Sequence, residues 1–174
     1  MHVMLDLETL GTNPNSAIIA IGATAFDPFS PSHSRFYRNI DLKSCVEIGA
    51  EIDPDTIIWW MQQSDEARAE LVHNALPVTQ ALEAFLMWLA EVPELEGVWG
   101  NGASFDNVLI AQTAKMAGLG ILWSHKLDRC YRTVANMNHN QPLVRSGTYH
   151  NALDDAITQA DHLIHIDSEL GCIL

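Results

Sequence analysis

The stretch "MLDLETLGTN", residues 4–13, places two carboxylates inside an apolar run that has the composition of a buried β-strand. Because side chains alternate across a strand, Asp6 and Glu8 project from one face together with Met4, and the intervening leucines project from the other face. Two like charges so close together repel each other, and each raises the pKa of the other. The stretch alone leaves two interpretations open: a site for a divalent cation, which takes carboxylate oxygens, or the solvent-facing side of a half-exposed strand.

A third acid follows a short apolar segment in "GNGASFDNVLI", residues 100–110. We expect a strand over residues 97–101 and a helix over residues 104–116, with Ser104 as its N-cap and Asp106 in its first turn. An acid in the first turn also complements the helix dipole. Asp106 taken alone therefore has a purely structural explanation.

A fourth acid lies near the C-terminus in "HNALDDAITQAD", residues 150–161. His150 lies at the mouth of the final expected helix, and Asp155 lies about one helical turn further along. Both side chains can therefore face a common point. Taken alone, a histidine beside acids at a helix start is more often a surface residue than a catalyst.

The rest of the chain alternates between strand and helix periodicity. Three strands with short connections favour an antiparallel meander, and the later alternation predicts one α/β domain over residues 1–174 with a mixed sheet. The expected strands cover residues 3–8, 16–27, 35–40, 97–101 and 126–130. The expected helices cover residues 53–64, 77–91, 104–116, 132–138 and 151–167, with connections at 28–32 and 140–149.

The chain is strongly acidic, with a net charge of −13. Because affinity for nucleic acid comes mostly from Lys and Arg on phosphates, this balance argues against a broad, sequence-tolerant DNA coat. It does not exclude an enzyme that grips a few nucleotides and uses divalent cations to neutralise its own acids. The candidates for a local basic patch are Lys43, Arg129, Arg132 and Arg145.

The cysteines and the apolar runs bear on the compartment. Cys45, Cys130 and Cys172 are widely spaced, which indicates free thiols in a reducing compartment rather than a disulfide framework. The sequence contains no apolar run of transmembrane length and no basic start followed by an apolar stretch. We therefore expect a cytoplasmic protein with no membrane partner.

Together the acidic motifs form a specific ordered pattern, "DLETLG" at 6–11, "NGASFD" at 101–106 and "HNALDDA" at 150–156. The pattern resembles the DEDDh branch of the DnaQ-like 3′–5′ exonucleases. The resemblance implies a ribonuclease H-like α/β fold, with a five-stranded mixed sheet flanked by helices. It also implies four metal-binding acids and a histidine base, which are here Asp6, Glu8, Asp106, Asp155 and His150. The neighbouring Asp154 lacks the family's spacing from the histidine.

The middle of the chain bears on the substrate. "IIWWMQQSDEAR" at 57–68 resembles a small bacterial and phage subfamily of these nucleases, some of them described as 3′–5′ exoribonucleases, and "DRCYRT" at 128–133 agrees with that placement. Trp59 and Trp60 point about 100° apart on a helix. We therefore expect at least one of them in the core and the other free to stack on a terminal base.

We therefore expect a metal-dependent 3′–5′ exonuclease that releases nucleoside 5′-monophosphates from single-stranded 3′ ends of RNA or DNA. The subfamily resemblance favours RNA, and it implies that backbone groups near Thr9 and Leu10 lie beside the terminal sugar. Two ions, Mg²⁺ or Mn²⁺, fit an oxygen-only ligand set. His150, with an ordinary pKa near 6.5, is suited to take a proton from the attacking water.

Two alternatives remain open at this level. The first is a catalytically silent nucleic-acid-binding module of the same fold, and the presence of all five motif residues argues against it. The second is a metal-dependent phosphatase or small phosphodiesterase, which would act on small esters and not on oligonucleotides. Many relatives in the family form dimers, so the resemblance also allows a homodimer.

Overall fold

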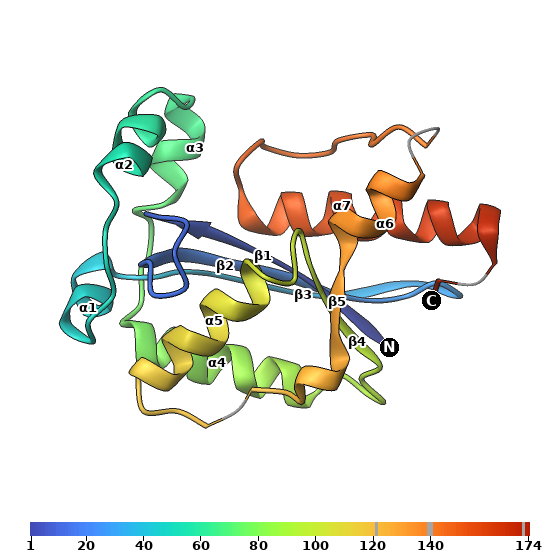
Figure 1. Ribbon diagram of the computed structural model, residues 1–174, viewed down its shortest axis with the longest axis horizontal. Coiled ribbons are helices and arrows are strands. Elements are labelled where there is room, and N and C mark those ends of the chain that lie inside the picture. Colours follow the sequence, from blue (N-terminus) through green and yellow to red (C-terminus); the bar gives the residue numbers. More distant parts are fainter. Residues whose placement is uncertain (121, 139–140, 172) are drawn as a thin grey trace.

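The computed structural model describes residues 1–120, 122–138, 141–171 and 173–174, with the backbone alone at residues 30–33. Cys172 and residue 140 of the expected loop lie outside the described residues. The strands form one sheet in the order β3-β2-β1-β4-β5 (Figure 1). Their bounds are β1 His2–Thr9, β2 Ile18–Asp27, β3 Ser30–Asn39, β4 Gly97–Gly100 and β5 Asp128–Cys130. The helices are α1 Leu42–Glu47, α2 Pro54–Met61, α3 Asp65–Glu70, α4 Val78–Ala90, α5 Asp106–Met116, η1 His125–Leu127, α6 Tyr131–Met137 and α7 Ala152–Leu170.

The sheet is mixed, with β1 at its centre. β1 pairs with β2 in antiparallel fashion, and β2 pairs with β3 in the same way. On its other side β1 pairs in parallel with β4, which pairs in parallel with β5. This arrangement confirms the expected antiparallel meander and the five-stranded mixed sheet.

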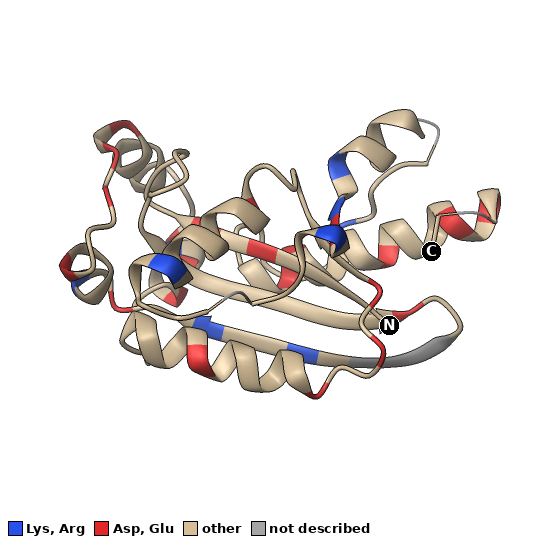
Figure 2. Cartoon of the chain, turned by 60° about the horizontal axis from the view of Figure 1, so that its bottom comes forward, with Lys and Arg blue, Asp and Glu red and all other residues tan. Residues whose placement is uncertain are grey.

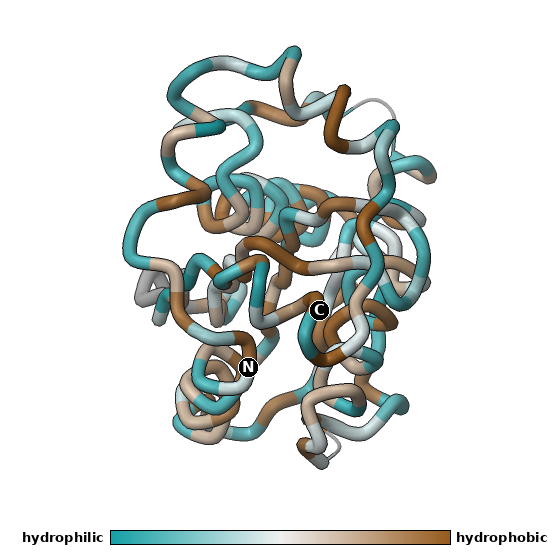
Figure 3. Tube along the Cα trace, turned by 90° about the vertical axis from the view of Figure 1, so that its left-hand side faces the viewer, coloured by the Kyte–Doolittle hydropathy of each residue, from teal (hydrophilic) through white to brown (hydrophobic). Residues whose placement is uncertain are grey.

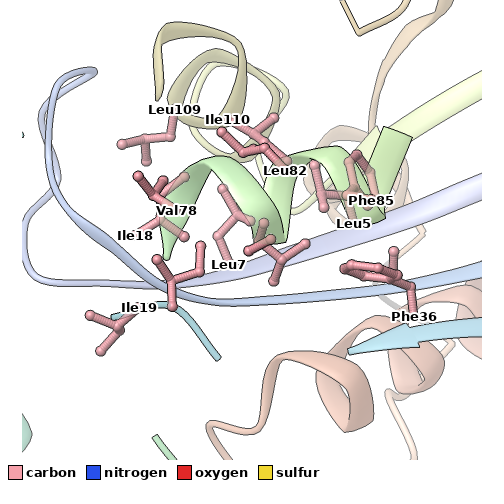
Figure 4. Packing of buried hydrophobic residues seen from close by; sticks show 14 of the residues in the cluster. Leu5, Leu7, Ile18, Ile19, Phe36, Val78, Leu82, Phe85, Leu109 and Ile110 are labelled. Carbon is pink, nitrogen blue, oxygen red and sulfur yellow. The ribbon is translucent and has the colours of Figure 1, made fainter. Parts of the chain in front are cut away.

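Helices cover both faces of the sheet, with α7 on one face and α4 and α5 on the other (Figure 1). Leu5 and Leu7 of β1 belong to the larger apolar cluster, which they share with Leu82 and Phe85 of α4 (Figure 4). Met4 belongs to the second cluster, on the side of α7. The alternation expected for β1 is therefore confirmed, and it directs the two acids of this strand toward α7. In Figure 3 hydrophobic segments run through the middle of the trace, and most peripheral loops are hydrophilic.

Two short helices were not expected from the sequence. α1 and α3 have six residues each, too few for a clear hydrophobic periodicity. Both begin at a side-chain cap, since Asp41 accepts from the backbone of Lys43 and Ser44, and Ser64 accepts from the backbone of Ala67. Cap chemistry was thus the signal available for them in the sequence.

Several expectations about element ends were wrong. β3 begins at Ser30, so the connection expected over residues 28–32 is shorter. Because β3 is an edge strand, it tolerates the proline at 31, which lacks a backbone donor. The N-cap of α5 is Phe105 rather than Ser104, and no side chain caps this helix. The final helix ends at Leu170, three residues beyond the expected end, where Gly171 adopts a left-handed conformation.

Among the described residues no helix combines the length and apolar character needed to cross a membrane.

The basic residues are spread over several elements (Figure 2). Lys43 lies on α1, at the opposite end of the molecule in Figure 1 from α6, which carries Arg132. Lys43 therefore does not join a basic patch with Arg132.

The close approach of α7 to the sheet depends on Gly22 of β2, which pairs with Asp6. A methyl group at this position would lie 2.1 Å from the carbonyl carbon of Ala152, the first residue of α7. The helix presents Ala152, Ala156 and Ala160 as fully buried small side chains at i, i+4 spacing. The sequence thus allows the start of α7 to lie directly on the central strands.

We expect Gly22→Ala to destabilise the protein by about 2–3 kcal/mol, because the added methyl displaces the start of α7. The melting temperature should fall by roughly 5–10 °C, and any activity that depends on the acid on α7 should fall at least about tenfold because that acid moves. Thermal unfolding and an assay of that activity test this. Gly120→Ala is the matched control, since no atom of the described residues lies within 4 Å of a methyl group added there, and an equal effect of both substitutions would contradict the explanation.

Candidate active site

Asp6 and Glu8 project from β1 toward α7, as the alternation predicts. Glu8 is buried, and Asp6 is half-buried. Burial raises the pKa of Glu8 to about 8, and the charges of Asp155 and Asp106 act in the same direction. Burial also raises the pKa of Asp6 well above its usual range, with further contributions from Asp106, Glu8 and Asp155. All four acids from distant parts of the chain therefore interact at this place.

Asp106 reaches the site because α5 starts six residues after β4 ends, and β4 lies beside β1. Its side chain is buried, and burial raises its pKa to about 7, with backbone N–H groups acting in the opposite direction. A methyl group at Gly100 would lie 3.0 Å from Oδ2 of Asp106 and 2.5 Å from Oδ1 of Asn107. A glycine at the end of β4 therefore allows the start of α5 to pack directly against the strand.

The start of α7 holds His150 and Asp155. Asn151 caps the helix by accepting from the backbone of Leu153 and Asp154. The backbone N–H of His150 donates to Oδ2 of Asp155 at 3.1 Å. His150 has φ +61°, in the left-handed region that ordinary residues occupy at a cost. Strain of this kind is a feature of functional sites.

Asp154 faces away from His150 and Asp155 and accepts a hydrogen bond from the preceding loop. Its Oδ2 accepts a hydrogen bond of 2.7 Å from the backbone of Thr148. A methyl group at Gly147, which has φ +76°, would lie 2.3 Å from the same oxygen. Of the two adjacent aspartates, Asp155 is thus the one that faces His150.

The donor chemistry fits divalent cations. Donor atoms of Glu8, His150 and Asp155 lie within 4.8 Å of one another, and Asp6 and Asp106 adjoin this group of three through their charges. Oε1 of Glu8 and Oδ2 of Asp106 are buried and have no hydrogen-bond partner among the described residues. Buried carboxylate oxygens without a donor are costly, and hard cations satisfy them. The residues present therefore fit a magnesium- or manganese-type site.

Gln159 was missed by the sequence reasoning. Its Nε2 donates to Oδ1 of Asp6 at 2.7 Å, and its side chain is buried. Gln159 lies one helical turn after Asp155 on α7, so the i, i+4 spacing is the signal that would have indicated a residue on the same face. The bond orients the carboxylate of Asp6 and leaves its second oxygen for other partners.

A cavity of about 450 Å³ adjoins Glu8. It is lined by Thr9, Trp59, Trp60 and Phe105 among others, and its size suits a small ligand. Trp60 is buried and donates from Nε1 to the carbonyl oxygen of Thr9 at 2.9 Å, whereas Trp59 is 41 % exposed. The structure therefore divides the two tryptophans into one core residue and one exposed residue.

Leu10 offers fewer groups to a ligand than Thr9 does. Its side chain belongs to the large apolar cluster. Its backbone N–H donates to Ala17 and its carbonyl accepts from Asp53. The contact of Thr9 and Leu10 with a terminal sugar stays a prediction.

A larger cavity of about 790 Å³ beside α5 and β5 is lined by described residues that include none of the five motif residues.

We expect Trp59→Ala to raise the KM for a substrate with a terminal base about tenfold, because an exposed ring beside the cavity is suited to stack on a base. The turnover number and the melting temperature should change little, since the side chain is partly exposed. Trp60→Phe is the contrasting variant, and it should lower the melting temperature because the bond to Thr9 is lost. An unchanged KM in Trp59→Ala would exclude the stacking role.

We expect the metal-free protein to lose stability as the pH rises from 5 to 8. The pKa values of Glu8 and Asp106, about 8 and about 7, lie above their ordinary values of 4.5 and 3.8, so the folded state binds more protons than the unfolded state across this interval. Manganese at one fixed concentration, about 100 times its Kd at pH 8, should restore roughly 5–10 °C at pH 8 and much less at pH 5, where protons compete for the acids. Thermal unfolding with and without a chelator measures this, and equal metal stabilisation at both pH values would contradict it.

The sheet order is that of the ribonuclease H-like fold of the DEDDh nucleases. The model of the 3′–5′ exoribonuclease Rv2179c-like domain matches residues 1–166, and the chain belongs to this family. The fold is also similar to the crystallographic structure of the nuclease domain of 3′hExo, a DEDDh family member, bound to rAMP. That match has a TM-score of 0.67 and 15 % identity, and it covers 98 % of this chain and 92 % of the other. A search of curated proteins returned no match.

Proposed function

We propose that this chain removes nucleoside 5′-monophosphates one at a time from single-stranded 3′ ends of RNA. Membership of a 3′–5′ exoribonuclease family supports the class of reaction. The observation that carries the proposed site is the convergence of donor atoms of Glu8, His150 and Asp155 within 4.8 Å. It is supported by one buried oxygen each of Glu8 and Asp106 that has no partner among the described residues. The finer points, namely the roles of single residues and the kind of ion, are our proposal.

Asp6, Glu8, Asp106 and Asp155 would hold two ions, Mg²⁺ or Mn²⁺. When bound, such ions neutralise the charge of the acids and the phosphate, and they make water more acidic. His150 accepts a proton from the attacking water at an unprotonated ring nitrogen. Burial lowers the pKa of His150, so the ring is neutral and able to accept a proton at pH 7.

The cavity beside Glu8 would hold the terminal nucleoside, with Trp59 against the base and Thr9 near the sugar. The acidic chain has few basic side chains to bind the phosphates of a long duplex, which supports short single-stranded ends as substrates.

The proposal of a homodimer rests on the family resemblance alone, and light scattering after gel filtration tests it. The free thiols of Cys45 and Cys130 support a reducing, cytoplasmic location.

Matched RNA and DNA oligomers, labelled at either end, test the proposed function with Mg²⁺ and with Mn²⁺. The 3′-labelled RNA should release labelled mononucleotide from the first time point, and the 5′-labelled RNA should give a ladder that shortens by one nucleotide. Internal cuts at early times, or hydrolysis of small phosphodiesters without any action on oligomers, would overturn the proposal. Binding of the oligomer without hydrolysis would indicate a silent binding module.

A further inference from the structure

Arg145 lies in the loop over residues 141–149, just before His150. Its Nη1 donates to Oδ1 of Asp155 at 2.7 Å. Of the ion pairs among the described residues, the Arg145–Asp155 pair is the one that joins a basic side chain to one of the four proposed metal-binding acids. The Asp155 side chain is 13 % exposed, whereas that of Arg145 is 47 % exposed. The guanidinium therefore reaches the acid from the solvent side.

Both oxygens of Asp155 have donors in this arrangement. Oδ2 accepts from the backbone of His150, and Oδ1 accepts from Arg145. By contrast, within the part of the chain that the structure describes, Oε1 of Glu8 and Oδ2 of Asp106 have no hydrogen-bond partner. A divalent cation that binds Oδ1 of Asp155 therefore competes with the guanidinium that donates to this oxygen.

The side chain of Arg145 can leave Asp155 without disturbing the loop. The loop backbone is tied to α7 independently, since Ser146 donates to Oγ1 of Thr158 and Thr148 donates to Asp154. The guanidinium also lies over the ring of Tyr149, 4.2 Å from its centre. An aromatic ring favours a cation on its face, so it can retain the guanidinium at the edge of the site.

We propose that Arg145 is an internal cation that occupies Asp155 until a divalent metal replaces it, and that the released guanidinium then binds a phosphate of the RNA end. This inference rests on the proposed function and adds a residue to it. A guanidinium matches the geometry of a phosphate with two parallel donors. Metal binding and RNA binding are then positively coupled, because the metal frees the group that holds the RNA.

The test uses Arg145→Gln with two titrations that should change in opposite directions. Calorimetry of Mn²⁺ binding without nucleotide should show about fivefold tighter binding than the wild type, because the competing ion pair is absent. Binding of AMP to the manganese-loaded protein should weaken at least about tenfold, because a charged hydrogen bond to the phosphate is lost. Arg145→Lys, which keeps the charge and loses the fork, should weaken AMP binding to a smaller degree.

Lys43→Gln is the matched control, since it removes one positive charge from an exposed pair with Glu47 on α1. It should leave both titrations unchanged. Equal or weaker Mn²⁺ binding by a folded Arg145→Gln, or unchanged AMP binding, would overturn the role of Arg145 and leave the proposed function standing. Failure of the wild type to bind Mn²⁺ would overturn the proposed function itself, and the role of Arg145 with it.

Discussion

Asp6→Asn should reduce the rate of RNA hydrolysis at least about 10³-fold and should remove the thermal stabilisation by Mn²⁺. Asp6 interacts with all three other acids. Burial raises its pKa most, and the charges of Asp106, Glu8 and Asp155 raise it further. An amide carries no charge and is a poor ligand for a hard cation in this position. The loss should therefore appear in metal binding and in catalysis together.

The same substitution should leave the metal-free protein folded and at least as stable at pH 8. The amide keeps the size of the side chain, and its oxygen can still accept the hydrogen bond that Gln159 donates at 2.7 Å. The buried negative charge and its repulsion from the other acids are removed. A gain in metal-free stability combined with a loss of metal response distinguishes a metal ligand from a structural acid.

Circular dichroism, thermal unfolding with and without Mn²⁺, and the rate on a labelled RNA together measure this outcome. Asp161→Asn is the matched control, because Asp161 is an exposed acid on α7. It should behave as the wild type in all three measurements. Near-wild-type hydrolysis by Asp6→Asn would show that the acids on β1 do not hold the reactive ions.

Local patterns in the sequence were sufficient for the parts of the fold that repeat regularly. Alternation in β1 gave the face on which Asp6 and Glu8 lie, because the period of a strand is set by its backbone. The i, i+4 spacing of α7 gave its extent to within three residues. α1 and α3 were not predicted, because six residues complete fewer than two helical turns and show no clear periodicity.

The parts of the site that escaped prediction depend on how distant segments pack. The bond from Gln159 to Asp6 joins residues 153 positions apart, and the pair of Arg145 with Asp155 depends on the path of the loop before α7. The expected cap at Ser104 failed because the backbone before α5 follows the turn that brings Asp106 toward β1, and Phe105 takes the cap position without a side-chain bond. Propensity describes a residue's local preference, and the path of the backbone before α5 overrides it here.

His150→Asn should reduce the turnover number by about 10²- to 10⁴-fold while the affinity for Mn²⁺ stays within about threefold of the wild type. Asparagine is the informative replacement because it tolerates the left-handed conformation that His150 adopts at φ +61°. Its side chain cannot accept a proton from water near neutral pH. The variant therefore removes the proposed base and keeps the backbone bond to Asp155.

The pH dependence separates a base from a residue that only shapes the site. Burial lowers the pKa of His150, the charge of Arg145 acts in the same direction, and Asp155 opposes them. A base with a pKa below 6.5 is neutral at pH 7, so the wild-type kcat should rise with pH and reach a plateau before neutrality. In His150→Asn this plateau should disappear, and the residual rate should follow the hydroxide concentration instead. A variant that retains the wild-type plateau at a reduced height would show that another group takes the proton and that the histidine acts through position alone.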